Sequence, residues 1–209
     1  MGINLGGGFN PMQGQQMQQP QMGGILNMQK NDIIDLTKRE PGLTKVLLGA
    51  GWDVSNGGSS FDLDISALLL NANGKLQNGG SDVIFFNNKV GQGIQLGGDN
   101  RTGAGAGDDE EIRINLTQIR SDVAKIVFII DIHEAMQKRQ TFGMVNHSYI
   151  RLTNEENGTE LCRFILKEDA STATTMIFAE LVKIGTDWNF KAIGEGKIAD
   201  LNNVLSIFI

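Results

Sequence analysis

The chain of 209 residues contains one cysteine, three prolines and two histidines. A single cysteine, Cys162, excludes an intramolecular disulfide and a zinc site built from cysteines. No apolar run approaches the roughly 20 residues that a membrane-spanning helix needs. Residues 1–29 carry no charged side chain and so lack the basic segment of a secretory signal. We therefore expect a soluble protein of the cytoplasm, without a membrane span.

Basic side chains are scarce in one stretch of the chain. From Asp53 to Glu111 there are nine acidic and three basic residues, whereas the rest of the chain has fifteen of each sign. The net charge of −6 therefore arises entirely within this stretch. Nucleic acid is an unsuitable partner, because phosphate binding requires a basic patch. The acidic stretch instead predicts a cationic partner.

Short strands separated by turns dominate the pattern after residue 25. The composition, 40% hydrophobic with 27 glycines, supports one buried core and many tight turns. Turns rich in glycine, asparagine and aspartate separate short apolar runs, which favours an all-β, antiparallel β-sandwich with one or two short helices. Helices are expected at 133–139 and 198–205, and strands at 33–36, 45–49, 61–70, 83–87, 94–96, 112–116, 125–132, 145–152, 160–166, 175–184 and 188–193.

The first 24 residues differ from the rest in composition. They are rich in glutamine, glycine and methionine and have no aliphatic periodicity that would build a core. We expect a flexible N-terminal arm over residues 1–24 and one domain over residues 25–209. The arm is either a solvated tail or a docking segment that orders on a protein partner or in self-assembly.

Oxygen-bearing side chains gather in three segments of the acidic stretch. In a strand over 61–66, Phe61, Leu63 and Ile65 face the core while Asp62, Asp64 and Ser66 share the opposite face. A glycine-rich loop over 97–110 and the segment 51–53 supply further acids. Hard oxygen ligands without histidine or cysteine suit Ca²⁺ better than Mg²⁺. The spacing is not that of an EF-hand, because alanine and asparagine replace the glycine and glutamate of that loop.

The same residues support a catalytic function less well than they support cation binding. Two aspartates on one strand face could stand roughly 5–10 Å apart, as a glycosidase requires. A shared cation, however, also explains the remaining acids. Cys162 lies in an expected strand, where an inert buried thiol is the commoner case. We expect binding rather than catalysis.

Several motifs together resemble the TerD family of tellurium-resistance proteins. They are Gly51-Trp52-Asp53, Phe61-Asp62-Leu63-Asp64-Ile65-Ser66, and the loop from Gly98-Asp99-Asn100 to Gly107-Asp108-Asp109-Glu110. The resemblance covers about residues 25–205. It implies a Ca²⁺-binding β-sandwich with a link to tellurite resistance and stress responses in bacteria and their phages. The ligands that it implies are Asp53, Asp62, Asp64, Ser66, Asp99, Asn100, Asp108, Asp109 and Glu110.

Two departures from the family pattern affect the expected function. Ala104 and Ala106 stand where family loops commonly carry acids, so the resemblance implies one missing ligand and a second ion that is lost or weakened. The N-terminal arm is additional to the family domain. A soluble calcium-binding stress protein is the first reading. The alternative is a structural component of a phage or phage-tail-like assembly, located in the particle, which the arm and the apolar end over 205–209 favour.

Overall fold

The computed structural model describes residues 24–54, 61–97, 107–166 and 171–209, with only the backbone described at Asp53, Val54 and Asn146. Apart from Gly24, the expected N-terminal arm lies outside the described residues. The expected ligands Asp99 and Asn100 lie outside them as well.

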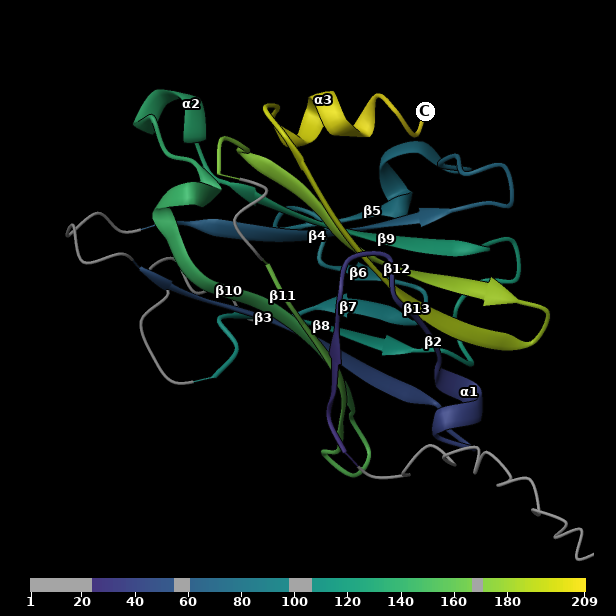
Figure 1. Cartoon of the computed structure of the whole chain (residues 1–209). Helices are drawn as coiled ribbons and strands as arrows, with labels where there is room; N and C mark the ends of the chain where they lie inside the picture. Colours follow the sequence, from purple (N-terminus) through teal and green to yellow (C-terminus); the bar gives the residue numbers. More distant parts are fainter. Residues whose placement is uncertain (1–23, 55–60, 98–106, 167–170) are drawn as a thin grey trace, which may run out of the picture.

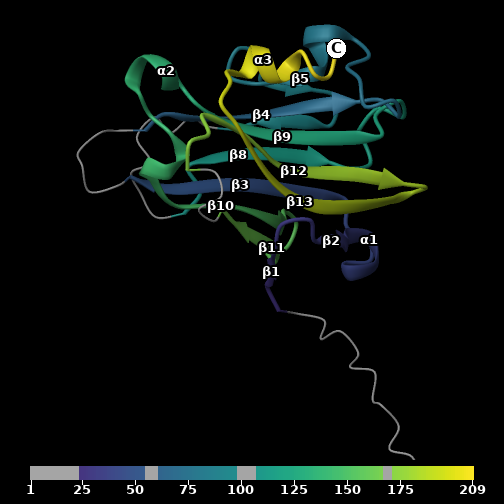
Figure 2. The same ribbon diagram turned by 45° about the horizontal axis from the view of Figure 1, so that its top comes forward.

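Two sheets pack face to face in two layers (Figures 1 and 2). All neighbouring strands are antiparallel except β1 and β11, which are parallel. This confirms the expected antiparallel β-sandwich. Sheet A has the order β1 (Leu26–Met28), β11 (Glu160–Ile165), β10 (Val145–Asn154), β3 (Lys45–Val54), β8 (Glu110–Asn115), β7 (Ile94–Leu96), β6 (Val90–Gly91). Sheet B has the order β2 (Ile33–Asp35), β13 (Asp187–Lys197), β12 (Thr175–Ile184), β9 (Lys125–Ile132), β4 (Leu63–Leu70), β5 (Val83–Ile84).

The helices are all short. α2 (Ala135–Lys138) and α3 (Leu201–Leu205) lie within the two expected helical segments. α1 (Leu36–Arg39) was not expected; the Asp35 side chain caps it by accepting from the Lys38 amide at 3.0 Å, and Leu36 is buried. Two 3₁₀ turns, η1 (Gly79–Asp82) and η2 (Phe142–Met144), complete the elements. None of the helices in the described ranges is long and apolar enough to cross a membrane.

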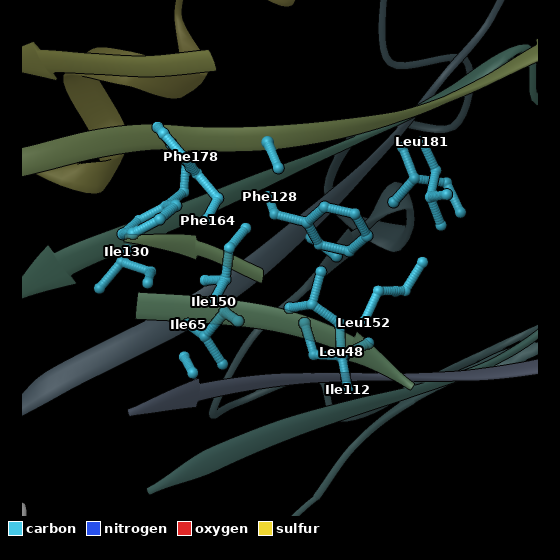
Figure 3. Packing of buried hydrophobic residues seen from close by; sticks show 14 of the residues in the cluster. Leu48, Ile65, Ile112, Phe128, Ile130, Ile150, Leu152, Phe164, Phe178 and Leu181 are labelled. Carbon is cyan, nitrogen blue, oxygen red and sulfur yellow. The ribbon is translucent and has the colours of Figure 1, made fainter. Parts of the chain in front are cut away.

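The main core lies between the sheets, as Figure 3 shows. Phe61, Leu63 and Ile65 are all buried, which confirms the inward face predicted for this segment. Phe164 of sheet A meets Phe178 of sheet B edge to face, with ring centroids 5.5 Å apart. Each fully buried side chain of this size contributes about 1.5–3 kcal/mol. The core therefore fixes which face of β4 is left for polar residues.

A second apolar cluster covers the outer face of sheet B. Its sheet residues, Leu68, Leu70, Val127, Ile129 and Ile177, pack against the C-terminal segment 199–208. Figure 1 shows α3 lying over this face, and the Leu76 amide donates to the Phe208 carbonyl at 2.8 Å. Of the apolar end over 205–209, which favoured assembly in the sequence, Leu205 and Phe208 pack against this cluster, whereas Ile207 and Ile209 are exposed.

Candidate functional site

β4 presents the predicted row of polar residues. Because Leu63 and Ile65 face the core, Asp64 and Ser66 face outward, on the side that carries the second apolar cluster. Asp62 precedes the strand, and its carbonyl accepts from the His133 amide at 2.8 Å. Ser66 is completely buried, and its Oγ has no hydrogen-bond partner in the described part of the chain. The row is thus half-buried, not the open strand face that alternation alone would give.

Asp131 of β9 joins this row, although it belongs to none of the acidic segments that the sequence pattern indicated. The β4–β9 register sets Asp131 directly opposite Asp64, and the β9–β12 register sets Thr175 on its other side. Burial and the charges of Asp64, Asp200 and Asp62 raise the pKa of Asp131 to about 7. Among the described residues, its Oδ1 atom is buried without a hydrogen-bond partner. We call Asp64, Ser66 and Asp131 the outer-face cluster.

The sequence contains one signal that could have pointed to Asp131. Between Ile126 and Ile132 it is the one charged residue in an otherwise apolar strand. An acid in such a run must find a partner or a proton. What the sequence did not contain was the pairing of β4 with β9, which brings Asp131 to Asp64.

Glu110 connects the acidic loop to β4. It begins β8 in sheet A and is almost fully buried, and its Oε2 accepts from the Ile65 amide of sheet B at 2.7 Å. β5 pairs with β4 only at Ala67 and Leu68, so the amide of Ile65 lies beyond the paired part of that edge. The two predicted segments, 45 residues apart in sequence, therefore meet at one point between the sheets.

Asp109 and Asp108 take different positions. Asp109 Oδ2 accepts from the Trp52 amide at 2.9 Å, and its own amide donates to the Ala50 carbonyl, which ties it to β3. Asp108 instead lies over Gly49, on the outer face of sheet A. Both of its oxygens are within 2.9 Å of Arg151 Nε, and Oδ1 also accepts from the Tyr149 hydroxyl at 3.0 Å. Its contacts thus belong to the sheet A surface.

The nine predicted ligands thus divide into three sets. Asp64 and Ser66 lie on β4 with Asp62 just before it, and Asp109 and Glu110 reach β3 and β4 from the start of β8. Asp108 is bound to Arg151. The side chain of Asp53, and Asp99 and Asn100 entirely, lie outside the described residues. Within the described ranges, no three His, Cys, Asp or Glu side chains form a ready-made metal-binding group.

Chemically, this region offers carboxylate and hydroxyl oxygens and partly shields them from water. His133 is the one histidine beside it, with Nδ1 3.5 Å from Asp64 Oδ2. Hard oxygen donors of this kind match Ca²⁺ and Mg²⁺ better than zinc or copper. The buried oxygens of Ser66 and Asp131 show that the donor set is not satisfied by described protein groups alone.

Comparison with known proteins places the chain in a family. Residues 25–208 match the model of the TerD domain. The tellurium resistance protein TerD of Serratia marcescens is 45% identical over 182 residues, covering 86% of this chain and 94% of that protein. General stress protein 16U of Bacillus subtilis is 43% identical over 175 residues, with 82% and 90% covered.

A solved structure supports the fold alone. It is a homologue of the telluride resistance protein (TerD) from Streptomyces coelicolor, 23% identical, with a TM-score of 0.63. The match covers 78% of this chain and 96% of that one. Taken with the domain match over residues 25–208, these likenesses show that the chain belongs to the TerD family.

Proposed function

We propose that this protein binds Ca²⁺ beside the part of β4 that the start of β8 contacts and acts in tellurium resistance or the stress response by binding, not by catalysis. Asp62, Asp64, Ser66 and Asp109 would hold the ion, with Asp53, Asp99 and Asn100 of the undescribed parts. Glu110 would shape the site through the Ile65 amide. When bound, the ion would supply positive charge that neutralises these carboxylates.

The contact between Glu110 and the Ile65 amide carries this proposal. It brings the acidic loop to β4 between Asp64 and Ser66, although the two segments are far apart in the sequence. Carboxylates gathered at a partly buried point repel one another unless a cation or protons compensate them. A flexible shell of roughly 6–8 oxygens is what Ca²⁺ requires, and a glycine-rich loop can supply carbonyl oxygens as well.

The names of relatives support the biological setting. The Serratia relative is named for tellurium resistance, and the Bacillus relative for general stress. Each is similar to this chain over more than four fifths of its own length. We therefore propose that the calcium site serves tellurium resistance or the stress response.

Calorimetry and thermal melts test the site. A ligand that binds only the folded state raises its stability once its concentration exceeds Kd, so Ca²⁺ should raise Tm by several degrees over chelator. Asp64→Asn should abolish Ca²⁺ binding. Glu111→Gln is the matched control, because Glu111 lies in the same acidic stretch but pairs with Arg113 at 2.9 Å on the outer face of sheet A. Equal Ca²⁺ binding by both variants would contradict the proposed site and would indicate that Ca²⁺ is attracted only by diffuse surface charge.

Growth in tellurite tests the proposed role in tellurium resistance. Cells that depend on this protein should lose tolerance when it carries Asp64→Asn and keep it with Glu111→Gln. If both variants protect equally while only one binds Ca²⁺, the calcium site and tellurium resistance are separate properties.

A further inference from the structure

Asp131 is a carboxylate that the family motifs do not account for. It lies on β9, outside the segments on which the resemblance rests, and directly opposite Asp64. Opposed residues of antiparallel strands have Cβ atoms about 4.5–5.5 Å apart. Two carboxylates at that separation repel each other unless a cation or a proton compensates them. The β4–β9 register therefore places a second carboxylate directly beside Asp64, which is one of the proposed ligands.

Two buried oxygens, one on Asp131 and one on the neighbouring Ser66, lack a hydrogen-bond partner in the described structure. Ser66 lies diagonally across the ladder from Asp131, because Ser66 is opposite Ile129. Ser66 Oγ and Asp131 Oδ1 are both buried without a hydrogen-bond partner in the described structure. Leaving a buried polar atom unpaired costs about 1–3 kcal/mol. One ion that binds oxygen would satisfy both atoms and separate the two carboxylates.

The chain around the outer-face cluster holds it in place. Thr175, opposite Asp131, donates to the Ala199 carbonyl at 2.7 Å, and Thr174 donates to the same atom. These bonds fix the segment that leads into α3 beside the cluster. Ile129 and Ile177 border it with apolar surface. A cation bound here would be screened from water on that side.

We propose that Asp131 is an additional ligand, which binds a divalent cation together with Asp64 and Ser66 on the outer face of sheet B. The inference rests on the proposed calcium-binding function and adds a carboxylate to it. The outer-face cluster supplies two carboxylates and one hydroxyl, all hard donors that suit Ca²⁺.

The test compares Asp131→Asn with the full-length wild type at pH 8, above the pKa of about 7 to which burial raises Asp131. Calorimetry should show Ca²⁺ affinity falling at least tenfold, or native mass spectrometry should show one ion fewer. In chelator, Asp131→Asn should melt higher than the wild type by about 2–4 °C, because a repulsion is removed. In Ca²⁺ the order should reverse. This change of sign separates a ligand from a residue that is merely structural.

Asp187→Asn is the control, because it removes the same charge at the far end of the same sheet, beside the Ile184–Asp187 turn. It should leave the affinity unchanged. Asp131→Thr carries the test if the asparagine variant does not fold. Wild-type affinity in a folded Asp131 variant would overturn the inference and leave the calcium function intact. A wild type that binds no Ca²⁺ would overturn both.

Discussion

Two glycines of β3 leave room for the side chains on the outer face of sheet A. A Cβ at Gly51 would lie 2.5 Å from the Tyr149 ring, and one at Gly49 would lie 1.9 Å from Asp108 Oδ2. Neither neighbour can easily move. The Arg163 guanidinium lies 4.4 Å from the centre of the Tyr149 ring, and Arg151 holds Asp108.

Gly51→Ala should therefore lower the free energy of unfolding by about 1–3 kcal/mol through overpacking. Urea denaturation measures the change. Gly80→Ala is the control, because nothing lies within 4 Å of a Cβ there. If the two variants are equally stable, the close approach of Tyr149 to β3 is incorrect.

Asp82 is a fully buried acid held by one guanidinium. Burial alone would raise its pKa, but hydrogen bonds from Arg120 and Asn78 outweigh burial and hold the pKa of Asp82 below its usual value. Arg120 Nη1 lies 2.6 Å from Asp82 Oδ1. A lowered folded-state pKa contributes stability above the unfolded value near 3.8, which is lost as pH falls through the lowered pKa.

Arg120→Met should cost about 3 kcal/mol at pH 7, because it leaves a buried charge unpaired. The loss should shrink toward pH 3, where Asp82 becomes protonated in the variant. Denaturant melts across that range give the profile. Arg113→Met, which breaks exposed pairs with Glu111 and Glu155, should cost less than about 1 kcal/mol. A loss independent of pH would contradict the role given to Asp82.

At the scale of elements, alternation in the sequence predicted most strands because one face of each is buried. β9, β10 and β12 begin at the expected residues. β6, with two residues, and α1, with four, are too short to leave a periodic signal, and α1 depends on the Asp35 cap. Asp64 and Ser66 were predictable as a pair because they share a strand. Asp131 was not, because strand pairing is a long-range property that one sequence does not display.

The C-terminal segment should be an integral part of the domain. Removing residues 201–209 would uncover Leu68, Leu70 and Val127 on sheet B. Each side chain exposed costs about 1.5–3 kcal/mol, so we expect a lower Tm and binding of a hydrophobic dye. Deleting residues 1–23 is the contrasting variant and should leave Tm nearly unchanged, because the buried core starts at Met28. A large loss of Tm in that variant would place the domain boundary before residue 24.

The whole molecule encloses its one thiol. Cys162 is fully buried in β11, and burial raises the pKa of its thiol to about 12, so almost no thiolate forms at neutral pH. This agrees with the inert thiol expected from the sequence. Its reaction with an alkylating reagent should therefore require opening of the sandwich.

Labelling of Cys162 should be slow in buffer and fast in urea, and Ca²⁺ should slow it further if the ion stabilises the fold. Mass spectrometry after timed exposure to iodoacetamide measures the rate. Fast labelling of the folded protein, with normal circular dichroism, would mean that β1 separates locally from β11 and exposes the thiol.

The parallel pairing of β1 with β11 has a consequence for the order of events during synthesis. Leu26 pairs with Cys162, so β1 cannot pair with β11 until most of the chain has emerged from the ribosome. Contacts between such distant segments form late and slow the folding of β-rich domains. Until then the inner side of β1, with Met28, has no partner and is a site where a nascent chain could associate wrongly. β1 is thus an early-synthesised strand that is set in place among the last, at the edge of sheet A.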